Sequence, residues 1–284
     1  MWRLGLASGL GEVSVNQGTD LKKNTVKQRL LAGETVVNGW LAIGSSYSAE
    51  IAGMAGFDAV TVDLQHGMIG FDAALGMFQA LSATPAVPLA RVPANDGPQI
   101  MRLLDAGAYG IICPMISTPE DAARFVSACR YPPQGDRSCG PARGLLYGGA
   151  DYLQHANEEM LRIGMIETQA GLDNLDKILE VEGLDGIYIG PNDLSFALGQ
   201  APSSEPTASV VVDAIAHILE RTLAHKKIPG IFCSSGQAAA MRIAQGFKIV
   251  TPGNEAALLA QALKLSVADA RSTSAKPKGT STGY

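Results

Sequence analysis

VPLARVPANDGPQIMRLLDAGAYGIIC, residues 87–113, contains one complete strand–helix–strand unit. Two short apolar runs flank a polar turn and a segment in which apolar side chains recur at helical spacing. The turn Asn95-Asp96-Gly97-Pro98 offers a capping side chain and a first-turn proline, which are typical of a helix start. Because both runs are almost continuously apolar, we expect each to be a parallel strand that is buried on both faces.

The same alternation extends in both directions along the chain, and it gives eight strand–helix pairs. The expected strands are Val36–Ile43, Ala59–Val62, Val87–Ala90, Gly110–Cys113, Arg162–Ile166, Gly186–Ile189, Pro229–Phe232 and Lys248–Val250. The expected helices are Ser48–Ala55, Phe71–Leu81, Gly97–Ala106, Pro119–Cys129, Ala170–Glu180, Ser209–Ala224, Gly236–Gln245 and Glu255–Val267. An unbroken run of eight pairs favours a closed barrel over an open doubly wound sheet. The sequence therefore predicts an α/β fold, a single-domain (β/α)8 TIM barrel.

Length and composition agree with one such barrel, since about 250 residues are typical of this fold. We expect a poorly ordered leader over residues 1–23, the barrel over 24–271, and a flexible tail over 272–284. A net charge of -5 without any run of Lys or Arg argues against nucleic acid as a partner. No apolar stretch approaches the roughly 20 residues that a membrane-spanning helix needs. Four cysteines without paired spacing indicate reduced thiols and a cytoplasmic protein.

Two long segments interrupt the alternation, at residues 131–160 and 194–207. We interpret both as loops at the C-terminal face of the barrel, where the active sites of this fold are built. Arg137 and Arg143 belong to the longer segment, and we expect them to contact solvent or the distal acid of a substrate.

Polar residues stand directly after most of the expected strands, which places them at the catalytic mouth of a barrel. They are Ser45 after strand one, Asp63 and His66 after strand two, Arg91 after strand three, Glu167 after strand five, and Gly190-Pro191-Asn192-Asp193 after strand six. Ser45 and the last four residues are candidates for substrate binding.

Glu167 and Asp193 follow neighbouring strands, so their carboxylates are expected to converge. Two carboxylates completed by water and a chelating substrate suit Mg²⁺ or Mn²⁺ better than structural zinc. The alternative is that each carboxylate only caps the helix that follows it.

His66 and Arg91 are the candidate catalytic groups of the same mouth. His66 lies three residues after Asp63, a spacing at which the carboxylate can hold the imidazole as an acid–base group. Arg91 ends an apolar strand, where its guanidinium can stabilise an enolate oxygen. The alternatives are a local structural pair for His66, and an internal salt bridge of Arg91 with Asp63 or Glu167. The turn at Gly190–Asp193 opens a helix, and its free backbone amides can hold a carboxylate.

Several quoted segments together carry a resemblance to a known family. In order, they are NGWLAIGSSYSAE, AGFDAVTVDLQHG, VPLARVPANDGPQIMRLLDAGAYGIICPMI, RYPPQGDRS, DYLQHANEE, MIET, VEGLDGIYIGPNDLS and KIPGIF, and they extend from about Asn24 to about Asp269. The chain resembles the HpcH/HpaI family of class II pyruvate aldolases, within the phosphoenolpyruvate/pyruvate barrel superfamily.

The resemblance implies a role for each candidate residue. Glu167 and Asp193 are similar to the metal ligands, with Mg²⁺, Mn²⁺ or Co²⁺ as the cofactor, and Arg91 to the enolate-stabilising arginine. His66 with Asp63 is similar to the dyad that acts through water on the aldol hydroxyl. The resemblance also implies a homo-oligomer, a hexamer or trimer of dimers, in which residues 255–267 are exchanged between subunits.

Three positions depart from the pattern that is usual in the family. Leu64-Gln65 replaces Gly-Glu, Met165 replaces Gln, and Ser138 replaces Gly. These departures leave the metal and enolate residues in place, but they put the transfer of a long diacid substrate in doubt.

The combined hypothesis is a metal-dependent aldolase. It would reversibly cleave a 4-hydroxy-2-oxo acid into pyruvate and an aldehyde through a metal-stabilised pyruvate enolate. The alternatives are citrate-lyase-like or mutase chemistry on the same barrel, and a non-catalytic sensor that binds an oxo acid.

Overall fold

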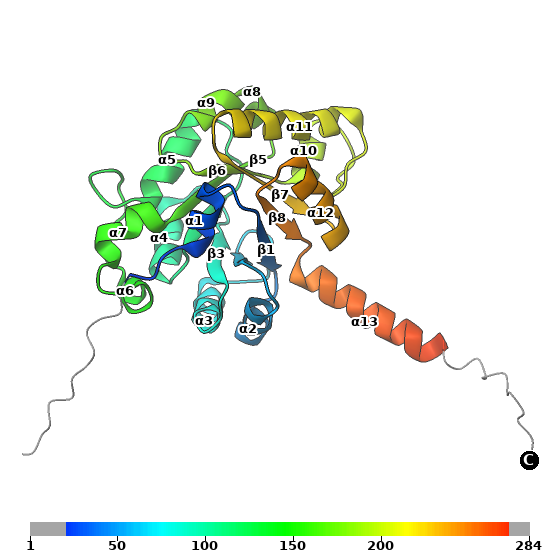
Figure 1. The fold of residues 1–284 in the computed structure, drawn as a ribbon, viewed down its shortest axis with the longest axis horizontal. Helices are drawn as coiled ribbons and strands as arrows, with labels where there is room; N and C mark the ends of the chain where they lie inside the picture. Colours follow the sequence, from blue (N-terminus) through cyan, green and yellow to red (C-terminus); the bar gives the residue numbers. More distant parts are fainter. Residues whose placement is uncertain (1–20, 273–284) are drawn as a thin grey trace, which may run out of the picture.

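Eight parallel strands close into a barrel in the computed structural model, which describes residues 21–272 (Figure 1). The strands are β1 Val36–Leu41, β2 Ala59–Asp63, β3 Val87–Arg91, β4 Gly110–Cys113, β5 Leu161–Ile166, β6 Gly186–Ile189, β7 Ile228–Cys233 and β8 Ile249–Pro252. They pair in chain order, and β8 pairs with β1. The predicted (β/α)8 barrel is therefore confirmed. Residues 1–20 and 273–284, which include most of the expected leader and tail, lie outside the described residues.

The strand register sets which side chains meet at the C-terminal face. Asp63 pairs with Arg91 across β2 and β3, so their side chains leave the sheet at the same level. Ile166 pairs with Ile189 across β5 and β6, which brings the next residues, Glu167 and Gly190, to one height. Neighbouring strand ends thus gather the expected site residues at one end of the barrel.

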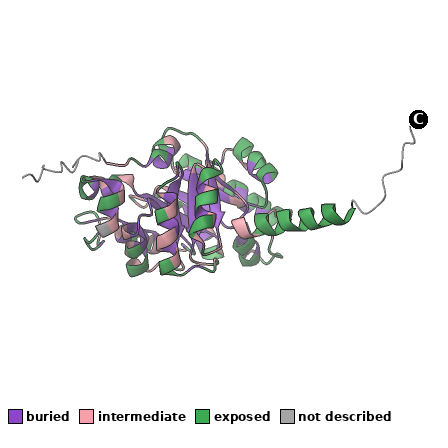
Figure 2. Ribbon diagram, turned by 90° about the horizontal axis from the view of Figure 1, so that it is seen from below, coloured by how far each residue is buried: buried purple, intermediate pink, exposed green. Residues whose placement is uncertain are grey.

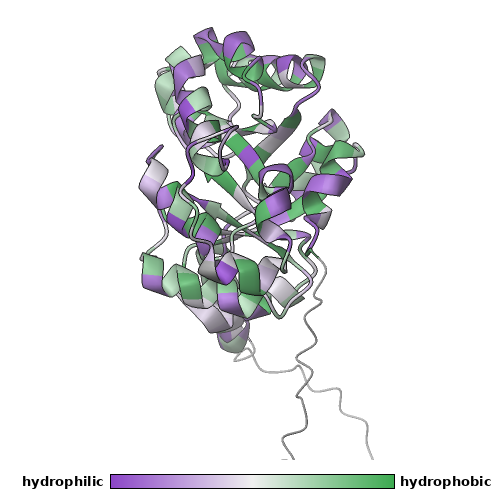
Figure 3. Cartoon of the chain, turned by 90° about the vertical axis from the view of Figure 1, so that its left-hand side faces the viewer, coloured by the Kyte–Doolittle hydropathy of each residue, from purple (hydrophilic) through white to green (hydrophobic). Residues whose placement is uncertain are grey.

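Helices cover the outside of the barrel, and their inner faces are buried (Figure 2). Hydrophobic and hydrophilic residues alternate along them in the way expected of amphipathic helices (Figure 3). Those that match the prediction are α2 Ser46–Met54, α3 Phe71–Leu81, α4 Gly97–Asp105, α5 Pro119–Cys129, α11 Ser209–Ala224, α12 Gly236–Gln245 and α13 Glu255–Ser272. The expected fifth helix is divided at Asn174 into α8 Gln169–Asp173 and α9 Leu175–Leu179. A further short helix, α10 Pro191–Ala197, begins directly after β6.

The interpretation of residues 131–160 as a loop at the C-terminal face is wrong, both in its secondary structure and in its location. The segment contains α6 Ala142–Gly148 and α7 Tyr152–Glu159. It connects α5 to β5, and a helix-to-strand connection in this fold returns the chain to the N-terminal face. The segment accordingly contacts the start of the chain there, since the side chain of Asn24 donates to the backbone oxygens of Tyr109 and Glu159.

Both ends of the described chain add features outside the eight-unit pattern. A helix that the sequence analysis missed, α1 Thr25–Leu31, precedes β1, and Lys22 before it donates its backbone N–H to Gly148. At the other end, α13 projects away from the barrel and buries none of its residues (Figures 1 and 2). Among the described residues, no helix has the length and apolar character needed to cross a membrane.

Candidate active site

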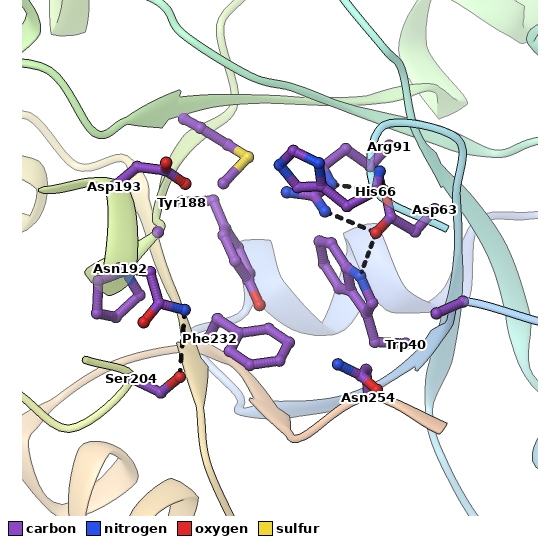
Figure 4. A pocket seen from close by; sticks show the side chains of 14 residues that line it. Trp40, Asp63, His66, Arg91, Tyr188, Asn192, Asp193, Ser204, Phe232 and Asn254 are labelled. Carbon is purple, nitrogen blue, oxygen red and sulfur yellow. Dashed lines mark hydrogen bonds and ion pairs between the residues drawn. The ribbon is translucent and has the colours of Figure 1, made fainter. Parts of the chain in front are cut away.

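A pocket of about 250 Å³ opens at the C-terminal end of the barrel (Figure 4). Its lining includes most of the residues that the sequence predicted for the site. The lining residues are Trp40, Ala42, Asp63, His66, Arg91, Met165, Tyr188, Gly190, Pro191, Asn192, Asp193, Ser204, Phe232 and Asn254. Residues from seven strands or the loops after them thus share one cavity, as in other barrel active sites.

Arg91 and Asp63 form a buried two-point ion pair in the wall of this pocket. The Arg91 Nε donates to Asp63 Oδ1 at 2.8 Å, and Nη2 donates to Oδ2 at 2.6 Å. Burial disfavours the charge on Asp63, but Arg91 and further donors outweigh it and hold its pKa below the usual range. Among residues 21–272 no acceptor is found for Arg91 Nη1, so its two N–H groups, together with the second N–H of Nη2, are the donors that Arg91 can offer to a bound molecule.

His66 lies at the exposed side of the pocket, and its contact with Asp63 differs from a side-chain dyad. Asp63 Oδ1 accepts the backbone N–H of His66 at 3.3 Å and that of Gln65 at 3.0 Å. Within the described part of the chain, the His66 imidazole makes no hydrogen bond. Asp63 therefore fixes the backbone that carries His66, while its charge is matched by Arg91.

Glu167 is buried beside the pocket, with a side chain only 3% exposed. Its Oε1 accepts the N–H of Met115 at 2.9 Å, and Met115 has φ 59°, a left-handed conformation uncommon outside glycine. Its Oε2 is buried without a hydrogen-bond partner among the described residues. Burial raises the pKa of Glu167 to about 7, the Met115 amide opposes this rise, and the charge of Asp193 adds to it.

An unpartnered buried carboxylate oxygen beside a second carboxylate is the donor chemistry that a hard divalent cation accepts. The described residues contain no group of three or more His, Cys, Asp and Glu side chains that could hold a metal ion. Glu167 and Asp193 therefore fit a cation that receives its other oxygen ligands from water or substrate, and they do not form a closed structural site.

The turn from β6 into α10 forms the side of the pocket opposite Arg91 (Figure 4). Gly190 is the N-cap of α10, and no side chain caps the first turn. Pro191 has no N–H, so the backbone amides of Asn192 and Asp193 are the free donors of this turn. Gly190 also lies against Glu167, because a β-carbon at this position would be 2.5 Å from Oε2.

Three sequence candidates lie apart from these groups. The Ser45 hydroxyl caps α2 by accepting the N–H of Ser48, and Ser45 is not among the pocket residues. Arg137 is fully buried and forms an ion pair with Asp105 at the end of α4, which is the N-terminal face of the barrel. Arg143 donates to the backbone oxygen of Ala106 at the same end. Neither arginine lines the pocket.

The sequence analysis did not select the aromatic residues of the pocket. Trp40 stacks on Tyr188 with 5.7 Å between ring centroids, and Phe232 meets Trp40 edge-on at the same distance. These residues lie within β1, β6 and β7, so the search for polar groups beyond the strand ends passed over them. Their position could have identified them in the sequence, because they are large aromatic residues near the C-terminal ends of otherwise aliphatic strands.

The closed barrel and its pocket of carboxylates, arginine and histidine have the architecture of a barrel enzyme, and comparisons identify the family. Residues 38–262 match the family described as HpcH/HpaI aldolase/citrate lyase. A hydroxypyruvate/pyruvate aldolase of Rhizorhabdus wittichii is 43% identical over 248 residues, which cover 87% of this chain and 99% of the relative. A 4-hydroxy-2-oxo-heptane-1,7-dioate aldolase of Escherichia coli is 37% identical over 262 residues, covering 90% of this chain and 98% of the relative.

A solved structure gives the same result. An HpcH/HpaI aldolase/citrate lyase family protein from Burkholderia cenocepacia superposes with a TM-score of 0.82 at 31% identity, covering 87% of this chain and 99% of the other. The chain belongs to the HpcH/HpaI aldolase/citrate lyase family. It is accordingly an aldolase, a carbon–carbon lyase, and the resemblance inferred from sequence is confirmed.

Proposed function

We propose that this aldolase reversibly cleaves a 4-hydroxy-2-oxo acid into pyruvate and an aldehyde with the help of a divalent cation at Glu167 and Asp193. The observation that carries the proposal is the unpartnered, buried Oε2 of Glu167 beside a pocket that also contains Asp193 and Arg91. Mg²⁺, Mn²⁺ and Co²⁺ all accept such oxygen donors. When bound, the cation supplies Lewis-acid polarisation of the 2-oxo group.

The backbone amides of Asn192 and Asp193 bind the substrate carboxylate in this proposal. The first N–H groups of a helix have no partner inside the helix, and they carry partial positive charge. Asn192 and Asp193 line the pocket, and Glu167 lies buried beside it against Gly190, so these amides would hold the 2-oxo acid end of the substrate beside the cation site.

Arg91 stabilises the enolate that forms when the bond between C3 and C4 breaks. The Nε–H and one N–H of Nη2 donate to Asp63, and the two N–H groups of Nη1 remain for the developing oxyanion. A donor that is fixed before the reaction stabilises charge without the cost of reorganisation.

In the cleavage direction His66 accepts the proton of the C4 hydroxyl as the bond between C3 and C4 breaks, and return of a proton to C3 of the enolate then releases pyruvate. Its ring lies at the exposed side of the pocket, so a water molecule can carry the proton between imidazole and substrate. Asp63 supports this step through the His66 backbone and through Arg91, in place of a hydrogen bond to the ring.

The substrate is expected to be short. The pocket volume of about 250 Å³ accommodates pyruvate together with a small aldehyde. The relative with 43% identity is named a hydroxypyruvate/pyruvate aldolase, which supports a small 2-oxo acid as the donor. A coenzyme A thioester carries phosphates that basic side chains would bind, but the one arginine of the lining is already paired with Asp63. The pocket therefore does not favour such a substrate.

We also propose that the enzyme is a cytoplasmic homo-oligomer, a hexamer or trimer of dimers, in which α13 packs on a second copy. The apolar side chains of Leu259, Leu263 and Leu265 are exposed on a helix of which no residue is fully buried against its own barrel. Glu255 fixes the start of this helix, because its carboxylate accepts the backbone N–H groups of Ala42 and Ile43, each at 3.0 Å. Exposed apolar surface on this scale is typical of an interface.

A cleavage assay tests the proposal. Short 4-hydroxy-2-oxo acids are incubated with enzyme and Mg²⁺ or Mn²⁺, and pyruvate release is followed with lactate dehydrogenase. The expected result is pyruvate release by the wild type that is lost in Glu167→Gln. Full activity of that variant would place the cation site elsewhere.

A further inference from the structure

Trp40 contacts both members of the Arg91–Asp63 pair. It lies in β1 with only 4% of its surface exposed. Its indole Nε1 donates to Asp63 Oδ2 at 3.1 Å, and the Arg91 guanidinium carbon lies 4.8 Å from its ring centroid. The side chain is therefore a hydrogen-bond donor to the carboxylate and an aromatic face for the guanidinium (Figure 4).

The two-point pair leaves one motion of the guanidinium open. Arg91 is bound through Nε and Nη2, so its plane can still tilt about the edge that joins these two atoms. Nη1 lies farthest from that edge and moves most when the plane tilts. The ring of Trp40 blocks the tilt on its side, and its N–H fixes the carboxylate to which the guanidinium is bound.

Trp40 is itself held on two sides. Its ring stacks on Tyr188 with an interplanar angle of 27°, and Phe232 contacts it edge-on. The Tyr188 hydroxyl in turn donates to Thr251 in β8 at 2.6 Å. Contact with aromatic rings from β6 and β7 restricts the orientation of the indole.

We propose that Trp40 is a positioning residue of the aldolase, which holds Arg91 so that Nη1 faces the substrate. This inference rests on the proposed role of Arg91 in stabilising the enolate. Trp40 affects the reaction through Arg91 and Asp63, and it takes no direct part in any chemical step.

The first test compares Trp40→Phe in the wild type and in an Arg91→Lys background. Phe keeps an aromatic ring and loses the N–H, while Lys keeps the positive charge and loses the planar fork. The readout is the rate of metal-dependent exchange of pyruvate methyl protons at saturating metal. Trp40→Phe alone should lower the exchange rate about tenfold with little change in KM, because a misplaced group lowers the rate more than it weakens binding. In Arg91→Lys the same substitution should cost less than about twofold. Equal losses in both backgrounds would overturn the proposal.

Tyr152→Phe is the matched control at the other end of the barrel. Tyr152 is buried, and its hydroxyl accepts a hydrogen bond at 3.1 Å from Arg137, which is paired with Asp105. This substitution also removes one hydrogen bond from a buried Arg–Asp pair, but far from the pocket. It should lower thermal stability to a similar extent without changing the exchange rate.

A second measurement does not depend on activity. The side-chain Nε–H of Arg91 is observed by ¹⁵N NMR, assigned by its loss in Arg91→Lys. Its hydrogen exchange should speed up at least about tenfold in Trp40→Phe and stay unchanged in Tyr152→Phe. If the Arg91 Nε–H exchanges in Trp40→Phe at the rate seen in the wild type, the role of Trp40 is refuted. If the wild-type enzyme does not exchange the methyl protons of pyruvate, the proposed function is refuted instead.

A benzothienylalanine at position 40 provides the variant closest in shape. It replaces the indole N–H with sulfur and preserves the ring system, so it removes the hydrogen bond with little effect on packing. This variant should speed up hydrogen exchange of the Arg91 Nε–H, but by less than Trp40→Phe does. An unchanged exchange rate would mean that the indole N–H plays no part and that Trp40 acts by packing alone.

Discussion

Replacement of Gly190 by alanine would perturb the cation site without changing a ligand. A β-carbon at this position would lie 2.5 Å from Glu167 Oε2 and 3.2 Å from the terminal carbon of Met165. Contacts between carbon and oxygen normally begin near 3.3 Å, so the carboxylate oxygen must move by about 0.8 Å. The backbone of Gly190 is extended, at φ -96° and ψ 94°, and alanine adopts this conformation without strain.

The expected result is a folded enzyme with a displaced carboxylate. The clash falls on the end of a flexible side chain, so stability should change by no more than about 1 kcal/mol. Displacement of a reacting or ligating group by about 1 Å can cost on the order of a hundredfold in rate. Mn²⁺ affinity is measured by electron paramagnetic resonance and turnover by pyruvate release, and both should fall at least about tenfold in Gly190→Ala.

Gly236→Ala is the control, because a β-carbon at the start of α12 meets nothing within 4 Å. It should leave Mn²⁺ affinity and turnover unchanged. A stable Gly190→Ala enzyme with wild-type Mn²⁺ affinity and turnover would refute Glu167 as the residue that holds the cation beside Gly190.

Three further predictions concern Arg91, Glu167 and α13. Arg91→Ala should lower turnover by about a hundredfold, as expected for the loss of an oxyanion donor, while calorimetry should show wild-type Mn²⁺ affinity; near-normal turnover would remove Arg91 from the mechanism. Because Glu167 with a pKa of about 7 must lose its proton to bind a cation, Mn²⁺ affinity should fall about tenfold from pH 8 to pH 6, and a flat titration would contradict this role. Leu259→Glu together with Leu263→Glu should lower the oligomeric mass in sedimentation, whereas an unchanged mass would place the interface elsewhere.

The barrel itself could be predicted because its physical signals are local and repeated. Each strand is a short apolar run buried on both faces, and several of the connecting helices begin with recognisable caps, such as Thr118 before α5. The strand ends then indicated which polar residues share one face. Asp63, His66, Arg91 and Asp193 all line one pocket, and Glu167 lies buried beside it.

Two features depend on pairings between distant segments, and the sequence did not determine them. The Asp63 carboxylate could reach either His66 or Arg91, and the register between β2 and β3 commits its oxygens to Arg91. The segment 131–160 carries polar and glycine-rich turns typical of a functional loop. Its position between α5 and β5 nevertheless places it at the N-terminal face, because a connection from a helix to the next strand lies at that face of the barrel.

Exchange of the pyruvate methyl protons in D₂O, followed by NMR with Mg²⁺ or Mn²⁺ and then with EDTA, tests the central claim most directly. This reaction needs neither the aldehyde nor knowledge of its identity, since it reports the formation of the enolate alone. The account predicts exchange that requires the cation, stops with EDTA, and is lost in Glu167→Gln. Exchange that persists in EDTA, or no exchange with any divalent cation, would contradict it.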